Sequence, residues 1–219
     1  MTERIDEIVL DGALPKVFVG DNLPPSDIWL TKAVLKRGER YCIDAASGTG
    51  KTSLCSFLYG VRRDYVGTIA FGPDDIRGFK IARWCELRRS HLAYLPQELD
   101  MFGELSALDN VMLKNRLTDF RSEAEIRAMF ERLEIDNRIA TPAGRMSVGQ
   151  RQRAALIRAL CQPFDFILLD EPVSHLDERN NELCASMIAD EAALRQAGVI
   201  FTSVGNRLAL KGDVTVLKL

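Results

Sequence analysis

Short apolar runs, each broken by glycine or proline, characterise the first third of the chain. Residues 8–10, 17–19, 41–43 and 67–72 are rich in β-prone side chains, and a tight turn at 36–39 precedes the third of them. Runs of this length between turn residues predict short β-strands. We therefore expect this region to form an antiparallel sheet that lies beside the main core.

The rest of the chain alternates helical and strand patterns. Residues 122–133 place Ile126, Met129, Phe130 and Leu133 three or four positions apart, which is one face of a helix. Four consecutive apolar residues at 166–169 fit a strand that is buried on both faces of a parallel sheet. The other predicted helices span 53–58, 80–89, 105–117 and 152–161, and the other predicted strands span 91–95 and 199–204.

One stretch between a strand and a helix has the pattern of a phosphate-binding loop. Residues 45–52 have the spacing G-x-x-x-x-G-K-S/T, with Ala45 in place of the first glycine. The glycines let backbone N–H groups point inward, and the following helix directs its positive dipole end at the phosphates. Lys51 would bind the β- and γ-phosphates, and the Thr52 hydroxyl would ligate Mg²⁺. The residues expected to bind nucleotide are Ala46, Ser47, Gly48, Thr49, Gly50, Lys51, Thr52 and Ser53.

A glycine-rich turn that happens to end in Lys-Thr is the alternative interpretation of this stretch. The second chemical centre argues against it, because Asp170 and Glu171 follow the apolar run 166–169. The carboxyl end of a parallel strand is where α/β sheets bind ligands. Asp170 would hold Mg²⁺, and Glu171 would orient or deprotonate the attacking water.

Several motifs in this order resemble those of ABC ATPases. Residues 145–153, Arg-Met-Ser-Val-Gly-Gln-Arg-Gln-Arg, resemble the L-S-G-G-Q signature and the helix that follows it. Gln97 comes after a strand and a proline, like the Q-loop, and residues 174–177 resemble the D-loop pattern S-x-L-D. The helix start at 105–111 is also similar, and the resemblance covers roughly residues 10–215.

The resemblance implies an α/β fold: a P-loop NTPase core with a parallel sheet, an antiparallel β subdomain and a helical ABC subdomain. One domain of 219 residues is expected, with the catalytic core and β subdomain at about 1–97 and 151–219 and the helical subdomain at about 98–150. Two cassettes, identical or different, would dimerise head to tail around two ATP–Mg²⁺. The segment that faces the partner's nucleotide would be Ser147, Gly149 and Gln150.

The resemblance also implies a partner. Gln97 would sense the γ-phosphate or Mg²⁺ and pass the change to the helical subdomain, which in transporters grips a membrane permease subunit. The expected function is therefore an ATP-hydrolysing subunit that powers a membrane transporter. The alternative is a degenerate or regulatory ABC ATPase with slow hydrolysis and no transport role. The compact form is most similar to lipoprotein-release, macrolide-export and cell-division cassettes.

Three departures from the family pattern bear on activity. Ala45 and Val148 each replace a family glycine. The family histidine after the strand 199–204 is missing, and Ser203 or Val204 stands in its place, so slow hydrolysis is expected. For stacking against adenine, Phe18 is the candidate and Trp29 the rival, although each can equally be a core residue.

Composition limits the partners and the compartment. A net charge of −2 does not fit an electrostatic nucleic-acid binder, so no nucleic-acid partner is expected. Five dispersed cysteines without a C-x-x-C motif favour a reducing compartment. No apolar run is long enough to cross a bilayer. We therefore expect a cytoplasmic protein that reaches the inner face of the membrane only through a permease.

Overall fold

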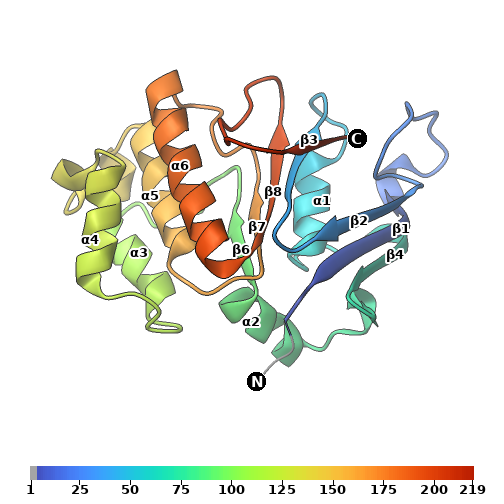
Figure 1. Ribbon diagram of the computed structural model, residues 1–219, viewed down its shortest axis with the longest axis horizontal. Helices are drawn as coiled ribbons and strands as arrows, with labels where there is room; N and C mark the ends of the chain where they lie inside the picture. The colour runs from blue at the N-terminus through green and yellow to red at the C-terminus, as the bar shows by residue number, and fades with distance from the viewer. Residues whose placement is uncertain (1–3) are drawn as a thin grey trace.

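The computed structural model describes residues 4–219. A five-stranded sheet stands at the centre, a four-stranded sheet lies to one side, and a group of helices lies to the other (Figure 1). The expected α/β architecture with a second, antiparallel sheet is confirmed. Within residues 4–219, no helix is both long enough and apolar enough to cross a membrane.

The antiparallel sheet has the strand order β2-β1-β4-β5. Its strands are β1 (Glu7–Pro15), β2 (Lys32–Lys36), β4 (Tyr65–Phe71) and β5 (Asp74–Asp75). The prediction of a strand at 17–19 is wrong, because β1 ends at Pro15 and the chain turns there into the 3-10 helix η1 (Lys16–Phe18). Val17 and Val19 are exposed, and within the described residues 4–219 no strand pairs with them, so their β-prone side chains stabilise no sheet here.

The central sheet is parallel throughout and has the order β6-β7-β8-β3-β9. Its strands are β3 (Arg40–Asp44), β6 (Leu92–Leu95), β7 (Phe166–Leu169), β8 (Gly198–Ser203) and β9 (Thr215–Lys218). All four residues of β7 are buried, as predicted. Phe166 and Leu168 join the core cluster on one face, and Ile167 and Leu169 join the cluster on the other.

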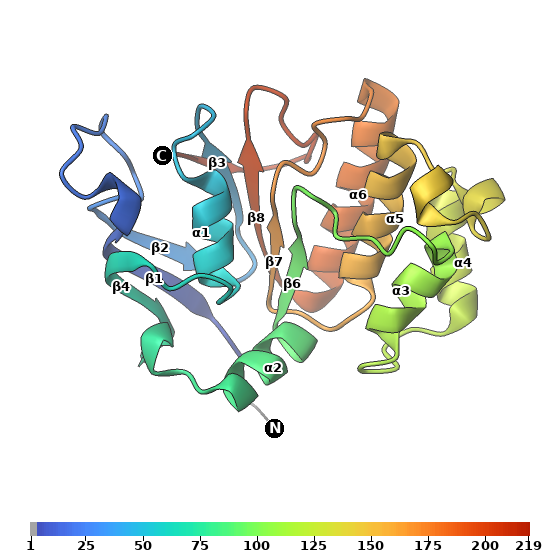
Figure 2. The ribbon, with the colours of Figure 1, turned by 180° about the vertical axis from the view of Figure 1, so that it is seen from behind.

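Different layers cover the two faces of this sheet. Helix α1 (Lys51–Leu58) and the antiparallel sheet cover one face, and α5 (Val148–Leu160) and α6 (Glu178–Arg195) cover the other (Figure 2). Helix α2 (Ile81–Ser90), which follows the 3-10 helix η2 (Ile76–Gly78), leads into β6. The five strands of the central sheet all run in the same direction, so the carboxyl ends of β3, β6, β7 and β8 meet at one edge of that sheet.

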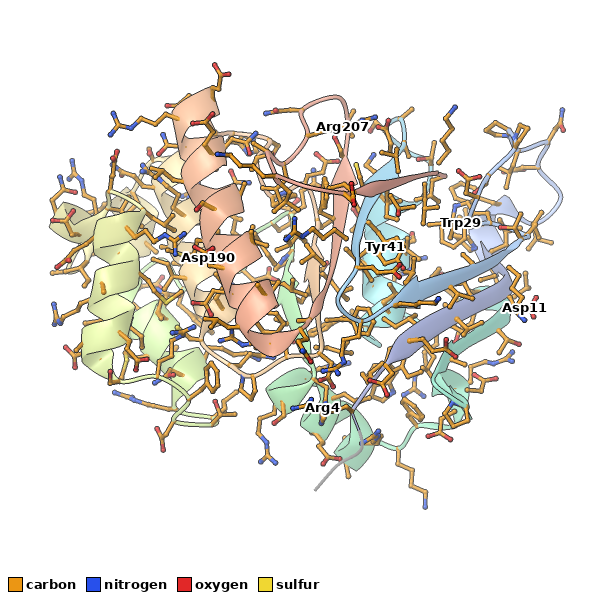
Figure 3. All side chains as sticks on the ribbon, viewed as in Figure 1. Arg4, Asp11, Trp29, Tyr41, Asp190 and Arg207 are labelled. Carbon is orange, nitrogen blue, oxygen red and sulfur yellow. The ribbon has the colours of Figure 1, made fainter. Side chains whose placement is uncertain are left out.

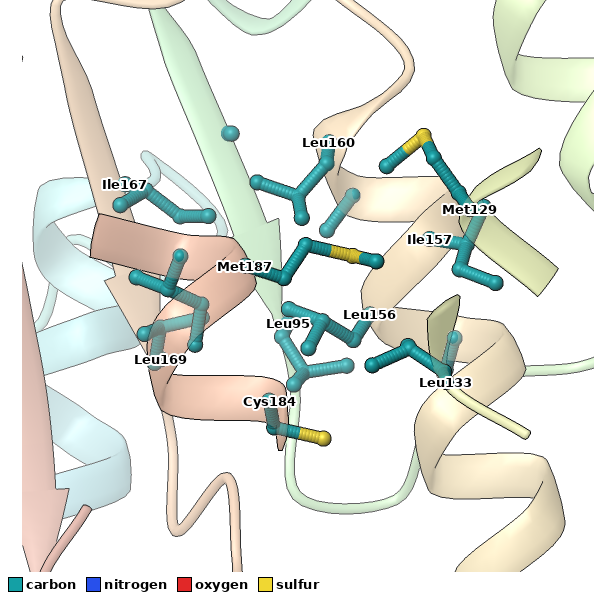
Figure 4. Close-up of a cluster of buried hydrophobic side chains, with 14 of the residues drawn as sticks. Leu95, Met129, Leu133, Leu156, Ile157, Leu160, Ile167, Leu169, Cys184 and Met187 are labelled. Carbon is teal, nitrogen blue, oxygen red and sulfur yellow. The ribbon is translucent and has the colours of Figure 1, made fainter. Parts of the chain in front are cut away.

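Two shorter helices form a group outside α5. They are α3 (Ala107–Asn115) and α4 (Glu123–Arg132), followed by the 3-10 helices η3 (Asp136–Arg138) and η4 (Ala143–Arg145). Ser122 and Glu125 form the predicted capping box at the start of α4. Met129 and Leu133 pack with Ile157 of α5 and Met187 of α6 in the larger core cluster (Figure 4). Burying a side chain of this size contributes about 1.5–3 kcal/mol, so this group is firmly attached to α5.

Candidate nucleotide site

The segment between β3 and α1 folds as a glycine-hinged loop. Gly48 and Gly50 have φ angles of 82° and 101°, where a side chain is disfavoured. Lys51 begins α1, and its ammonium donates to the carbonyls of Ala45 at 3.2 Å and Ala46 at 2.9 Å. Only 5% of the Lys51 side chain is exposed, so its charge points into the loop. This is the arrangement expected of a phosphate-binding lysine.

Two aromatic side chains flank the loop on the side of the antiparallel sheet. A Cβ on Gly50 would lie 3.1 Å from the Phe18 ring and 3.3 Å from the Trp29 ring, so both rings contact the loop backbone. Trp29 is buried, and its indole N–H donates to the Thr49 carbonyl at 3.1 Å (Figure 3). Phe18 is half-buried. Trp29 therefore stabilises the loop through its hydrogen bond, and the Phe18 ring is the more exposed of the two aromatic side chains.

Asp170 lies at the carboxyl end of β7, beside the loop. Its backbone N–H donates to the Leu95 carbonyl at 2.9 Å, and its Oδ1 accepts from the Thr202 hydroxyl at 2.8 Å. The other carboxylate oxygen, Oδ2, is buried and has no hydrogen-bond partner. Burial first, and then the charge of Asp170, raise the pKa of the Cys55 thiol on α1. A buried, unsatisfied carboxylate oxygen is a suitable ligand for a hard cation such as Mg²⁺.

The carboxylate of Glu171 connects the loop to the Q-loop-like residue. Its Oε1 lies 3.7 Å from the Lys51 ammonium, and its Oε2 accepts from the Gln97 amide at 3.5 Å. Glu171 is half-buried, and Gln97 is exposed. Three residues from distant parts of the chain thus meet at the carboxyl edge of the sheet, which brings together the predicted catalytic set.

The backbone of Glu171 lies in the left-handed region, with a φ of 51°. Its N–H donates to Thr202 Oγ1 at 2.9 Å, and its carbonyl accepts from Gln152 Nε2 at 3.2 Å. Sequence reasoning missed both partners. For Thr202, the available signal was a hydroxyl side chain that follows the apolar run Val199-Ile200-Phe201.

The signature-like segment forms the N-terminus of α5. Ser147 is the N-cap, and its Oγ accepts from the Gln150 N–H at 3.3 Å. The Gln150 side chain accepts in return from the Ser147 N–H at 3.0 Å, which completes a capping box. The helix thus begins at Val148, four residues before its predicted start at 152. A Cβ on Gly149 would lie 3.3 Å from the His175 carbonyl, so this helix end touches the D-loop-like segment.

Within residues 4–219, no hydrogen bond or ion pair joins Ser147, Gly149 or Gln150 to the phosphate loop. A cavity of about 350 Å³ separates the signature-like segment from the Q-loop-like segment, and its lining includes Gln97, Val148, Arg151 and His175. The signature-like residues thus form a second polar surface, apart from the phosphate loop of the same chain.

The position of the missing histidine has a different polar arrangement. Strand β8 ends at Ser203, which is buried and donates its hydroxyl to the Asn206 carbonyl at 3.1 Å. Val204 is 47% exposed. The following loop is tied down by the Asn206 amide, which donates to the Val173 carbonyl at 3.1 Å, and by an Arg207–Asp44 ion pair at 2.6 Å (Figure 3). The Ser203 hydroxyl is therefore already used within its own loop.

Comparison with known proteins places these features in one family. The model of the family described as ABC transporter matches residues 31–174. The chain is 29% identical over 182 residues to the lipoprotein-releasing system ATP-binding protein LolD of Legionella pneumophila (strain Paris), covering 82% of this chain and 80% of that protein. It is 27% identical over 171 residues to the ABC transporter ATP-binding protein YtrE of Bacillus subtilis (strain 168), covering 77% of this chain and 73% of that protein.

Solved structures agree on the fold. The dimeric structure of MJ0796, a bacterial ABC transporter cassette, is similar with a TM-score of 0.79 and 22% identity. The similarity covers 96% of this chain and 94% of that one. At this level of identity the comparison establishes the architecture of the chain.

Proposed function

This chain belongs to the ABC transporter family, and from that membership and the geometry of its site we propose that it is the ATP-hydrolysing subunit of a membrane transporter. The observation that carries the proposal is the meeting of Lys51, Glu171 and Gln97 at the carboxyl edge of the parallel sheet. The buried ammonium of Lys51, next to the carboxylate of Glu171 and the amide of Gln97, is a suitable set of groups for phosphoryl transfer to water.

Each residue of the set has a distinct proposed role. The loop 46–53 and Lys51 bind the phosphates of ATP, and Phe18 lies against the base. Glu171 orients or deprotonates the attacking water, and Gln97 contacts that water or the metal. Mg²⁺, when bound, would supply positive charge that offsets the charge of the phosphates. Asp170 and Thr52 fit its binding, because the unpaired Oδ2 of Asp170 provides the carboxylate ligand and Thr52 is exposed at the start of α1.

We propose that two cassettes act together. The capped N-terminus of α5 offers backbone N–H groups and the Ser147 hydroxyl hydrogen to an anion. Among residues 4–219, it forms no hydrogen bond or ion pair with the phosphate loop. A second cassette placed head to tail would bring the Ser147–Gln150 segment onto the partner's ATP. The structure of the MJ0796 cassette is dimeric, which supports the pairing of two cassettes.

A groove on the helical side provides the proposed permease-binding surface. This coupling groove has a volume of about 280 Å³ and lies next to the Q-loop-like segment. Arg158 holds its floor by donating to the carbonyls of Asp100, at 2.6 Å, and Leu99. Phe102, Leu113 and Leu117 expose apolar surface along it, which suits an amphipathic helix of a membrane protein. The lining residues are Tyr59, Tyr94, Pro96, Asp100, Phe102, Asn110, Leu113, Lys114, Leu117, Arg158 and Ala159.

We place the protein at the inner face of the membrane, held there through the coupling groove. A photo-crosslinking residue at Leu117, introduced in cells, should capture one polytopic membrane protein, and a residue at exposed Leu194 on α6 should not. The captured protein, reconstituted in vesicles with this chain, should then stimulate ATP hydrolysis. Absence of ATP hydrolysis by the reconstituted pair would contradict the proposed function.

A specific observation favours slow hydrolysis by this chain alone. The Ser203 hydroxyl donates to the Asn206 carbonyl, and the Val204 side chain has no donor, so neither side chain replaces the phosphate contact of the missing histidine. One lost preorganised donor lowers the rate by about 10²–10³-fold. The regulatory alternative, an ABC ATPase without a transport role, would be favoured if turnover stayed this slow with the membrane partner present.

A further inference from the structure

Glu171 adopts a backbone conformation that its residue type disfavours. Its φ of 51° lies in the left-handed region, where residues other than glycine, asparagine and aspartate are uncommon. Such a residue persists only when its surroundings hold it there. Because the backbone sets the direction of the side chain, contacts that fix this conformation also fix where the carboxylate points.

Two buried side chains hold the peptide groups on either side of the Glu171 Cα. Thr202 of β8 accepts from the Glu171 N–H at 2.9 Å, and Gln152 of α5 donates to the Glu171 carbonyl at 3.2 Å. Thr202 is 1% exposed and Gln152 is 3% exposed, so both partner side chains are held in fixed places by the surrounding core. The Thr202 hydroxyl also donates to Asp170 Oδ1 at 2.8 Å, which makes one hydroxyl orient both acids.

We propose that Gln152 and Thr202 are positioning residues that hold Glu171 in place for hydrolysis, and we call this pair the Glu171 clamp. The inference rests on the proposed role of Glu171 as the residue that activates water. Both residues act through the backbone of Glu171, and Thr202 acts on the Asp170 carboxylate as well. Ser174, which is exposed, adds a weaker third contact through its hydroxyl, 3.2 Å from the Glu171 carbonyl.

The position of Gln152 gives the clamp a second consequence. Gln152 lies two residues beyond Gln150, on the first turns of the same helix α5. The N-terminus of that helix is the surface proposed to bind the partner's ATP. A helix moves as a rigid element, so a shift of α5 on binding the second ATP would carry Gln152 with it. The clamp thereby links hydrolysis at one site to occupancy of the other.

The chain contains a matched control for Gln152. Gln162 follows α5 at its other end, is 1% exposed, and donates to the Leu92 carbonyl at 3.0 Å and to the Pro163 carbonyl at 3.4 Å. In both glutamines the Oε1 atom is buried without a partner. Leu92 is the first residue of β6 and pairs with Phe166 at the start of β7, whereas Asp170 and Glu171 follow the other end of β7. Gln162→Leu thus removes a bond of the same kind with the same change of side chain, far from Glu171.

The test compares steady-state ATP hydrolysis and ATP affinity in the full chain with its membrane partner. Gln152→Leu and Thr202→Val should each lower kcat by about 10–100-fold, the usual effect of losing a partner that orients a functional group. The Kd for ATP should stay within threefold. Thr202→Ser keeps the hydroxyl and should restore kcat, and Gln162→Leu should leave kcat within threefold of wild type.

A double-mutant test separates the clamp from the role of Glu171. In a Glu171→Gln background, Gln152→Leu should cause no further loss of the residual rate, because it acts only through that residue. Wild-type turnover by Glu171→Gln would refute the proposed role of Glu171. An inactive Glu171→Gln protein beside fully active Gln152→Leu and Thr202→Val proteins would overturn the clamp alone. An equal loss in Gln162→Leu would overturn it as well, since the effect would then be structural.

Discussion

Lys51→Met is expected to weaken ATP binding by about 10- to 150-fold. The side chain of Lys51 is almost fully buried, and its ammonium donates to two loop carbonyls. Its charge would therefore act on the phosphates of ATP with little screening by water. A charge-assisted bond of this kind contributes about 1.5–3 kcal/mol. At about 1.4 kcal/mol for each factor of ten, this range gives the stated loss. Methionine keeps the unbranched stem and removes the charge.

The matched comparison is Gln97→Ala, because Gln97 borders the same site without carrying charge. Its amide is exposed and lies 3.5 Å from Glu171 Oε2, which is a weak contact. We expect the Kd of this variant to stay within about threefold of wild type, while partner-coupled hydrolysis falls. Titration calorimetry with ATP and Mg²⁺ measures both affinities. An equal loss of affinity in the two variants would show that the roles assigned to Lys51 and Gln97 are wrong.

Three further predictions concern assembly, turnover and pH. Glu171→Gln should keep ATP binding and trap the ATP-bound cassette dimer, measured by light scattering; a variant that stays monomeric with ATP and the membrane partner would contradict it. Ser203→His or Val204→His should raise steady-state ATP turnover, and unchanged rates in both would show that neither position replaces the family histidine. Burial, with Arg158 and Arg88 nearby, lowers the pKa of Lys114 to about 8. The unfolded chain therefore holds this proton at pH values where the folded protein has lost it, so the free energy of unfolding should rise between about pH 8 and 10. Lys114→Met should remove that rise in chemical denaturation curves.

The sequence predicts those elements whose side-chain pattern has one interpretation. Four consecutive apolar residues define β7, and the capping box with apolar spacing defines α4. The prediction of a strand at 17–19 failed although local β propensity was equally high there. The neighbouring strand β4 begins at Tyr65, the partner of Pro15, so among residues 4–219 no strand pairs with 17–19. Strand formation depends on a partner, which a local pattern does not contain.

The residues of the candidate site also fall into two groups, those that the sequence predicts and those that it does not. Lys51, Asp170, Glu171 and Gln97 were predictable because each belongs to a spaced motif at the end of a strand or the start of a helix. Thr202 and Gln152 belong to no such motif. Their role depends on the left-handed backbone of Glu171 and on the register of β7 beside β8. These are properties of three dimensions, and only the folded chain shows them.

The ion pair between Lys51 and Glu171 implies an order of events. In the state described, the ammonium faces the carboxylate at 3.7 Å and is bonded to the carbonyls of its own loop. Arriving phosphates would draw Lys51 toward themselves, since they carry more negative charge than one carboxylate. Glu171 would then be released to bind water only after the nucleotide is seated. Because the Glu171 carboxylate would stay paired with Lys51 until phosphates bind, nucleotide binding would come before the activation of water.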